Sequence, residues 1–144
     1  SAASSDYPLR DVYKRQVLRT RVESDTYATS YFDPRGAQDL YFPIPDTPFL
    51  KVSAVADDAG GLSLFLLNRD LAQEVAVTMD ARNFGRLKVV EAEEMRHDDL
   101  RAINSKDAPN AVRPTPLAGV AVDGGTIRAT LKPASWTVIK LAPA

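Results

Sequence analysis

Hydrophobic and polar positions alternate along much of the chain, and one stretch breaks that alternation. Residues 62–67 are apolar on both faces of a strand, with Leu62, Leu64 and Leu66 on one face and Phe65 and Leu67 on the other. An antiparallel strand with one face in water carries polar residues on that face. The sequence therefore predicts that both faces of this strand are covered.

Seven further segments have the short, mostly alternating pattern of strands: residues 17–23, 49–56, 74–80, 86–95, 120–122, 126–132 and 136–141. Glycine-containing turns at 57–61 and 123–125 predict hairpins, because glycine adopts positive φ freely. The mixed pattern of 86–95 predicts a bulged strand. Short strands separated by frequent turns indicate an all-β fold, an antiparallel β-sandwich.

One short helical turn is expected at residues 97–104. An aspartate can cap its start, and Leu100 and Ile103 form an apolar pair with the spacing i, i+3. The rest of the chain is expected to form strands and loops.

Residues 24–48 show no sustained period and carry four prolines. They also hold five of the eleven aromatic residues, namely Tyr27, Tyr31, Phe32, Tyr41 and Phe42. We interpret this stretch as a long aromatic and proline-rich connector, because loops of this length in compact domains are functional or join domains. Its rings could stack on sugars, but packing against a neighbouring surface is the favoured interpretation.

Residues 1–16 differ from the rest of the chain. Residues 1–5 are small and polar, and the segment lacks the apolar core of a signal peptide. The run 11–16 resembles the conceptual translation of a sequencing adaptor, as found at the ends of assembled metagenomic genes. The alternative is a genuine disordered leader, and both interpretations leave the segment without function. We therefore expect the folded domain to comprise residues 17–144.

Composition narrows the function classes. A net charge of -1 provides no broad basic field for nucleic acid or an anionic membrane. No apolar run approaches the roughly 20 residues of a membrane helix, so the sequence predicts a soluble protein. The absence of cysteine excludes disulfides and thiolate metal sites without deciding the compartment.

Carboxylates are the only plentiful catalytic material, and none forms a convincing site. A glycosidase needs two carboxyl groups roughly 5 to 9.5 Å apart. The adjacent pairs are Asp57/Asp58, Glu93/Glu94 and Asp98/Asp99. Neighbours on a strand project to opposite faces, and aspartates in turns and caps have local reasons to be there. His97 stands alone, so we predict no catalytic, cofactor-binding or metal-binding residues.

Several segments, taken in order, resemble the C-terminal domain of family 51 glycoside hydrolases, the α-L-arabinofuranosidases. Residues 64–69 (LFLLNR) resemble the family's apolar strand ending in Asn-Arg. Residues 91–104, with their Asp-Leu-x-Ala-x-Asn turn, and 109–114 (PNAVRP) resemble its next strand and loop. The end of the chain, 131–141 (LKPASWTVIKL), resembles the family's closing strand. Residues 17–27 are similar to the exit from the family's catalytic barrel.

The resemblance implies a jelly-roll β-sandwich that packs on and stabilises a catalytic (β/α)₈ barrel, in an enzyme that acts on arabinan or arabinoxylan. The barrel, with its two catalytic glutamates, has no counterpart among these residues and needs about 200 residues of its own. We thus expect an accessory domain that is not catalytic alone, with a homo-oligomer as a possible state. The parent enzyme is expected in the bacterial cytoplasm rather than secreted.

The alternative is a stand-alone carbohydrate-binding module. In that case the aromatic residues of 27–42, or Trp136, would form a platform for sugars. Trp136 follows a proline-containing turn at the start of the last strand, where packing in a core or interface is the favoured role. In the doubly apolar strand we assign Leu62, Leu64 and Leu66 to the core of the sandwich. The other side, Phe65 and Leu67, has two candidate covers: the 27–49 segment or the barrel.

Overall fold

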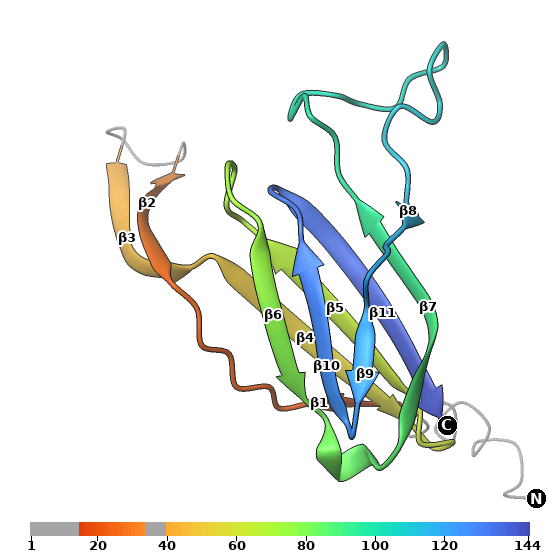
Figure 1. Ribbon diagram of the computed structural model, residues 1–144. Coiled ribbons are helices and arrows are strands. Elements are labelled where there is room, and N and C mark those ends of the chain that lie inside the picture. Colours follow the sequence, from red (N-terminus) through yellow and green to blue (C-terminus); the bar gives the residue numbers. More distant parts are fainter. Residues whose placement is uncertain (1–14, 34–39) are drawn as a thin grey trace, which may run out of the picture.

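The computed structural model describes residues 15–33 and 40–144, which form strands joined by turns and loops (Figure 1). The strands are β1 (Arg15–Leu18), β2 (Thr26–Asp33), β3 (Leu40–Pro48), β4 (Leu50–Asp57), β5 (Leu62–Asn68), β6 (Val75–Asp80), β7 (Leu87–Met95), β8 (Thr115–Pro116), β9 (Ala121–Asp123), β10 (Thr126–Leu131) and β11 (Ser135–Pro143). A single 3₁₀ turn among the described residues, η1, spans Arg82–Phe84.

Two antiparallel sheets lie face to face (Figure 1). The larger sheet has six strands in the order β1-β4-β5-β11-β7-β8, and the smaller has three in the order β6-β10-β9. Every recorded strand pairing is antiparallel. The predicted all-β sandwich is confirmed, including the tight hairpin between β9 and β10.

The hydrophobic core fills the space between the two sheets. Leu66 and Ile139 from the larger sheet, and Ile127 and Leu131 from the smaller one, are fully buried. Burying a side chain of this size stabilises the folded state by about 1.5 to 3 kcal/mol. Along β5 the leucines at 62, 64 and 66 are buried and the residues between them are half-buried, so the predicted assignment of the inner face is correct.

The bulge expected in the strand at 86–95 lies at Val90. Lys140 of β11 pairs with Glu91, and the next residue, Leu141, pairs with Val89. Val90 is therefore the extra residue in β7, and its side chain is 62% exposed. A bulge of this kind bends the strand and lets an apolar residue sit outside the core.

The helical turn expected at residues 97–104 is wrong. This stretch contains one isolated turn closed by a hydrogen bond from the Ala102 amide to the Asp99 carbonyl, 3.0 Å, and no helix. Leu100 and Ile103 are 61% and 74% exposed, so most of this apolar pair is not packed against the described domain. Without that packing, the cost of nucleating a short helix is not offset.

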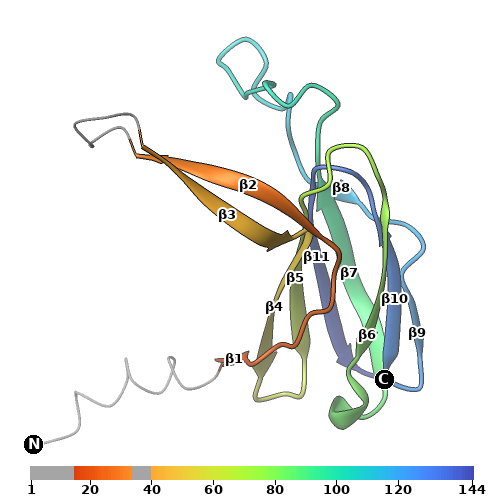
Figure 2. The ribbon, with the colours of Figure 1, turned by 90° about the vertical axis from the view of Figure 1, so that its left-hand side faces the viewer.

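The irregular structure expected for residues 24–48 is also wrong, because β2 and β3 pair as a long antiparallel hairpin. Each of these two strands has one free edge, and proline is tolerated on such an edge because it lacks only an amide donor. The register shifts between Tyr27 and Thr29, next to Asp46, whose φ is 54°. Within the described residues the hairpin forms a sheet of its own and projects from the sandwich (Figure 2).

The first strand also departs from expectation. β1 begins at Arg15, two residues inside the segment predicted to be a disordered leader, and pairs with β4. It ends at Leu18, whereas the alternating pattern predicted a strand to Glu23. Val22 nevertheless packs against the core. The adaptor-like run 11–16 lies mostly outside the described residues.

Candidate functional site

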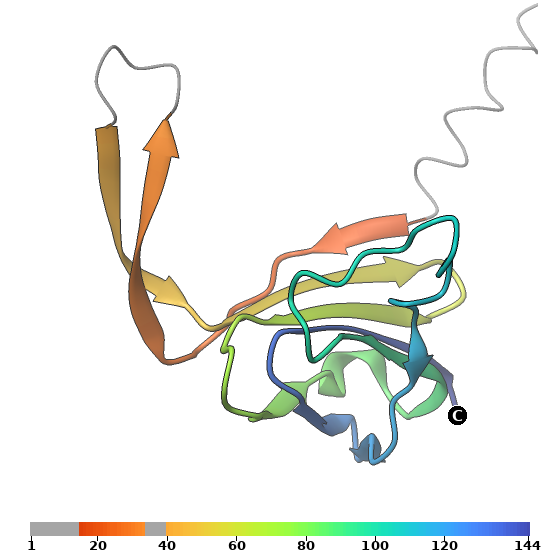
Figure 3. The same ribbon diagram turned by 90° about the horizontal axis from the view of Figure 1, so that it is seen from above.

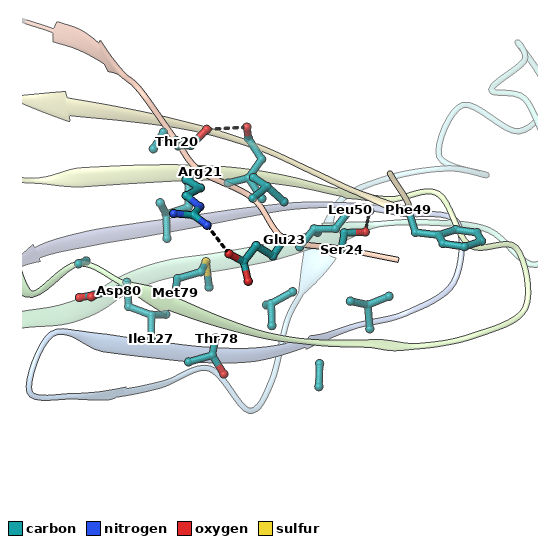
Figure 4. A pocket seen from close by; sticks show the side chains of 18 of the residues that line it. Thr20, Arg21, Glu23, Ser24, Phe49, Leu50, Thr78, Met79, Asp80 and Ile127 are labelled. Carbon is teal, nitrogen blue, oxygen red and sulfur yellow. Dashed lines mark hydrogen bonds and ion pairs between the residues drawn. The ribbon is translucent and has the colours of Figure 1, made fainter. Parts of the chain in front are cut away.

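A cleft of about 1450 Å³ lies between the two sheets (Figure 4). It exists because the smaller sheet ends at β6, while the larger sheet continues past β5 to β4 and β1. Core residues such as Leu50, Leu64 and Ile127 form part of its lining. The segment 18–25 borders one side and β6 the other.

Polar groups on the 18–25 side of this cleft are used to hold the chain in place. The Leu50 amide donates to Ser24 Oγ at 3.1 Å, and the Thr20 hydroxyl donates to the Val52 carbonyl at 3.3 Å. Arg21 and Glu23 form an ion pair of 2.8 Å with both side chains at least 80% exposed. Exposed pairs of this kind contribute little to stability.

Asp80 and Arg82 form a more definite pair at the end of β6. Arg82 Nη2 lies 2.6 Å from Asp80 Oδ2, and Arg82 Nε lies 2.9 Å from Oδ1. These side-chain hydrogen bonds, helped by the Arg82 backbone amide, lower the pKa of Asp80 to about 2. The same contact raises the pKa of Arg82. A carboxyl group with so low a pKa remains ionised near neutral pH and is a poor general acid.

The adjacent carboxylate pairs singled out in the sequence have local structural roles. Asp57 Oδ1 accepts hydrogen bonds from two amides of its turn, at 2.9 and 2.8 Å. Asp98 pairs with Arg96 at 2.7 Å, and Asp99 Oδ1 accepts from the Arg101 amide at 2.9 Å. His97 Nδ1 lies 3.0 Å from the Asp99 amide.

Glu93 and Glu94 point to opposite faces of β7, as the strand geometry predicts. Glu93 is half-buried on the outer face, and Glu94 is 4% exposed on the inner face, where it forms an ion pair with Lys132. Residues 15–33 and 40–144 contain no cluster of three or more side chains of metal-ligating type. Within the described chain, the geometry thus joins carboxylates to turns, arginines or lysine, and not to one another.

The sequence reasoning missed the role of a buried polar residue, Asn68. Asn68 is fully buried, and its amide group donates to the carbonyls of Gln73, Leu131 and Lys132 at 2.9 to 3.3 Å. Its Oδ1 accepts from the Asp70 amide at 3.0 Å. Asn68 therefore links the larger sheet to the loops around the smaller one. The only sequence signal is its position directly after the apolar run.

The outer face of the larger sheet carries an apolar cluster at one end, which we call the outer-face cluster: Phe65, Leu67, Met95, Trp136 and Val138. The rings of Phe65 and Trp136 stack with their centroids 6.2 Å apart and their planes at 22°. Trp136 is 43% exposed, and the other members are half-buried. A groove of about 270 Å³ runs between this cluster and the loop after β7, with Leu100 and Val112 on the loop side.

Comparison with known proteins adds the decisive observation. The sequence profile of the α-L-arabinofuranosidase C-terminal domain family matches residues 9–135, most of the chain. The chain belongs to this family. The domain is 31% identical over 127 residues to the exo-α-(1→6)-L-arabinofuranosidase of Bifidobacterium longum. It is 28% identical over 127 residues to the intracellular exo-α-(1→5)-L-arabinofuranosidase of Streptomyces lividans.

Solved structures of the family have the same fold. The family 51 α-L-arabinofuranosidase of Thermotoga petrophila superposes with a TM-score of 0.72 and 26% identity over 86% of this chain. The matches cover 85% and 88% of this chain for the two curated relatives, but only 22% and 17% of those relatives, and 25% of the Thermotoga structure. The domain thus spans about a fifth of the length of the relatives it matches. The part of the chain that the structure describes holds no helix with the length and hydrophobicity of a membrane span.

Proposed function

We propose that this domain is the accessory part of an α-L-arabinofuranosidase, and that a catalytic (β/α)₈ barrel elsewhere in the parent enzyme cleaves terminal α-L-arabinofuranosyl groups. The observation that carries the proposal is the asymmetry of coverage. Nearly nine-tenths of this chain matches arabinofuranosidases, yet it accounts for less than a quarter of each curated relative named above.

The geometry of the domain supports an accessory role over a catalytic one. A retaining glycosidase holds two carboxyl groups about 5 to 5.5 Å apart on rigid elements. Here Asp57 and Asp99 accept hydrogen bonds from turn amides, Asp80 is paired with arginine, and Glu94 is paired with lysine. Each of these four carboxylates is already engaged in a local contact, which supports a structural contribution of the domain.

The substrate and location of the parent enzyme follow from its relatives as part of the same proposal. Two relatives are named for exo-acting cleavage of α-(1→5)- or α-(1→6)-linked L-arabinofuranosyl groups. Arabinan or arabinoxylan fragments are thus the proposed substrate class. The Streptomyces lividans relative is named as intracellular, which supports a cytoplasmic parent enzyme. A homo-oligomer of that enzyme is part of the proposal.

The test uses a chimera in which this chain replaces the matching C-terminal part of the Bifidobacterium longum enzyme. We expect the chimera to hydrolyse nitrophenyl α-L-arabinofuranoside and to melt at a higher temperature than the same enzyme truncated before that part. The 144-residue chain alone should release no nitrophenol. Turnover by the chain alone, or a chimera no more stable than the truncated enzyme, would falsify the proposal.

A carbohydrate-binding module remains the competing candidate because Trp136 is 43% exposed beside Phe65. Stacking on a sugar ring requires a free aromatic face, and the stack with Phe65 already uses one face of Trp136. Affinity electrophoresis of the isolated chain in gels with arabinan or arabinoxylan distinguishes an accessory domain from a carbohydrate-binding module. We expect unchanged mobility, whereas retardation abolished by Trp136→Ala supports the binding module.

A further inference from the structure

We propose that the outer-face cluster is the surface through which this domain docks onto the catalytic part of its parent chain. The inference rests on the proposed function and adds to it the place of contact. Its occupant is an apolar surface of the same polypeptide. Four observations lead to this assignment: the register of the cluster, its charged border, its size, and the segments that flank it.

The register of the larger sheet places the cluster on one face in two adjacent rows. Leu67 pairs with Trp136, which pairs with Met95, and this forms one row. Phe65 pairs with Val138 in the next row, two residues along each strand. Side chains in paired positions of neighbouring strands lie in contact distance. The five side chains therefore form one continuous apolar surface on the side of the sheet opposite the core.

Polar residues border this surface and limit its extent. The next row pairs Ser63 with Lys140 and Lys140 with Glu91, and the last two form an exposed ion pair. At the ends of the apolar rows stand Lys51 and Glu93. A surface that is apolar in the middle and charged at its rim is the anatomy of a protein interface.

The size of the cluster favours an occupant on the same chain over a second copy. An aromatic side chain such as Phe65 or Trp136 has an area of about 150 to 250 Å², so with at most half of each of the five side chains exposed the cluster offers on the order of 400 Å². A stable dimer of separate chains needs about 800 Å² from each partner. Contacts between domains of one chain can be smaller, because the covalent link supplies a high effective concentration.

Two segments frame the same side of the sheet. The hairpin β2–β3 and the loop between β7 and β8 both extend on the side that faces away from the smaller sheet (Figures 2 and 3). The loop carries Leu100 and Ile103, which are 61% and 74% exposed, and Leu100 lines the groove beside Trp136. An isolated two-stranded hairpin is marginally stable in water, so a docked partner would stabilise β2–β3. The same partner would bury the exposed apolar side chains of the loop.

The experiment compares matched variants in the isolated chain and in the chimera described above. Val138→Ser and Leu67→Ser remove apolar groups from the cluster. Val90→Ser and Leu71→Ser make the same chemical changes at side chains that are 62% and 69% exposed outside it. We expect the cluster variants to lower the melting temperature of the chimera by about 5 °C more than that of the isolated chain. The two control variants should have equal, small effects in both settings.

The outcomes separate this inference from the proposed function. Suppose that the chimera is active and stabilised, but the cluster variants lower the melting temperature equally in the chimera and in the isolated chain. The proposed docking surface is then wrong, while the accessory role stands. If the chimera gains no stability from the wild-type chain, the proposed function itself fails and the docking surface with it. Sedimentation of the isolated chain tests whether a second copy of the domain binds the outer-face cluster instead. A dimer that Leu67→Ser dissociates would also overturn the assignment.

Discussion

Both faces of β5 and β11 carry large apolar side chains, but the two faces have different surroundings. On the inner face, Leu66 and Ile139 are fully buried beneath the smaller sheet. On the outer face, Phe65 is half-buried and Trp136 remains 43% exposed. Among the described residues, the inner apolar face is therefore fully covered and the outer one only in part. An apolar pattern predicts that a face will be covered, but the cover can belong to another part of the polypeptide.

The largest effect should come from truncating the inner face. Leu66→Ala removes a fully buried side chain from the centre of the core, and we expect a loss of about 2 to 5 kcal/mol of unfolding free energy. Leu67→Ala, one residue along the same strand, should cost about 1 kcal/mol or less in the isolated chain. Urea denaturation of both variants measures the contrast, and equal losses would contradict the distinction between the faces.

The second-largest loss of stability is expected at Asn68, because it ends the doubly apolar strand and donates hydrogen bonds to three carbonyls. Asn68→Ala leaves those buried groups without their donor, and the expected loss is about 2 kcal/mol. Asn83, which is exposed in η1, is the matched control, and Asn83→Ala should change stability by less than about 0.5 kcal/mol. If Asn68→Ala lowers the stability no more than Asn83→Ala does, the hydrogen bonds of Asn68 between the layers do not stabilise the fold.

A substitution on the inner face should stabilise the domain. Thr137 is fully buried, and among the described residues no partner lies within hydrogen-bond distance of its hydroxyl. Thr137→Val keeps the shape and removes a desolvated polar group, so we expect a gain of about 1 kcal/mol. Thr130→Val, at an exposed position of β10, is the control and should be nearly neutral. A loss of stability in Thr137→Val would indicate a hydrogen bond to this hydroxyl.

The smallest effect on stability is expected for the ion pair Asp80–Arg82, which lies outside both apolar faces. The pKa of Asp80 is lowered to about 2 by Arg82, below its ordinary value of 3.8. A lowered pKa adds stability above pH 4, and that stability is lost as the pH falls from about 4 to 2. Because both groups are exposed, the change in stability should be slight. Carboxyl NMR titration should show the pKa of Asp80 rising toward 3.8 in Arg82→Gln.

The sequence predicted those elements whose alternation is continuous and whose turns contain glycine. The inward leucines of β5, the hairpin around Gly124 and Gly125 and the bulge in β7 all follow from local pattern. The hairpin β2–β3 was missed because its three prolines argue against an ordinary strand, although a two-stranded sheet tolerates them at its free edges. The helical turn near Leu100 was predicted from a spacing that no packing partner supports.

The candidate site also combines features that the local sequence predicts with features that it does not. That the carboxylate pairs belong to turns and strands follows from spacing alone, because neighbouring residues on a strand face opposite ways. The burial of Glu94 beside Lys132, and of Asn68 between the layers, depends on residues far apart in the sequence. No local pattern carries that information.

The sequence by itself determined that the chain is an all-β sandwich and that one strand is apolar on both sides, because side-chain alternation is a property of each strand alone. Only the tertiary structure decided how each of those sides is covered. The smaller sheet covers the inner leucines and leaves Phe65 and Trp136 at the surface. The reason is physical: hydrophobic burial depends on which surfaces meet, and that is settled by the packing of whole sheets.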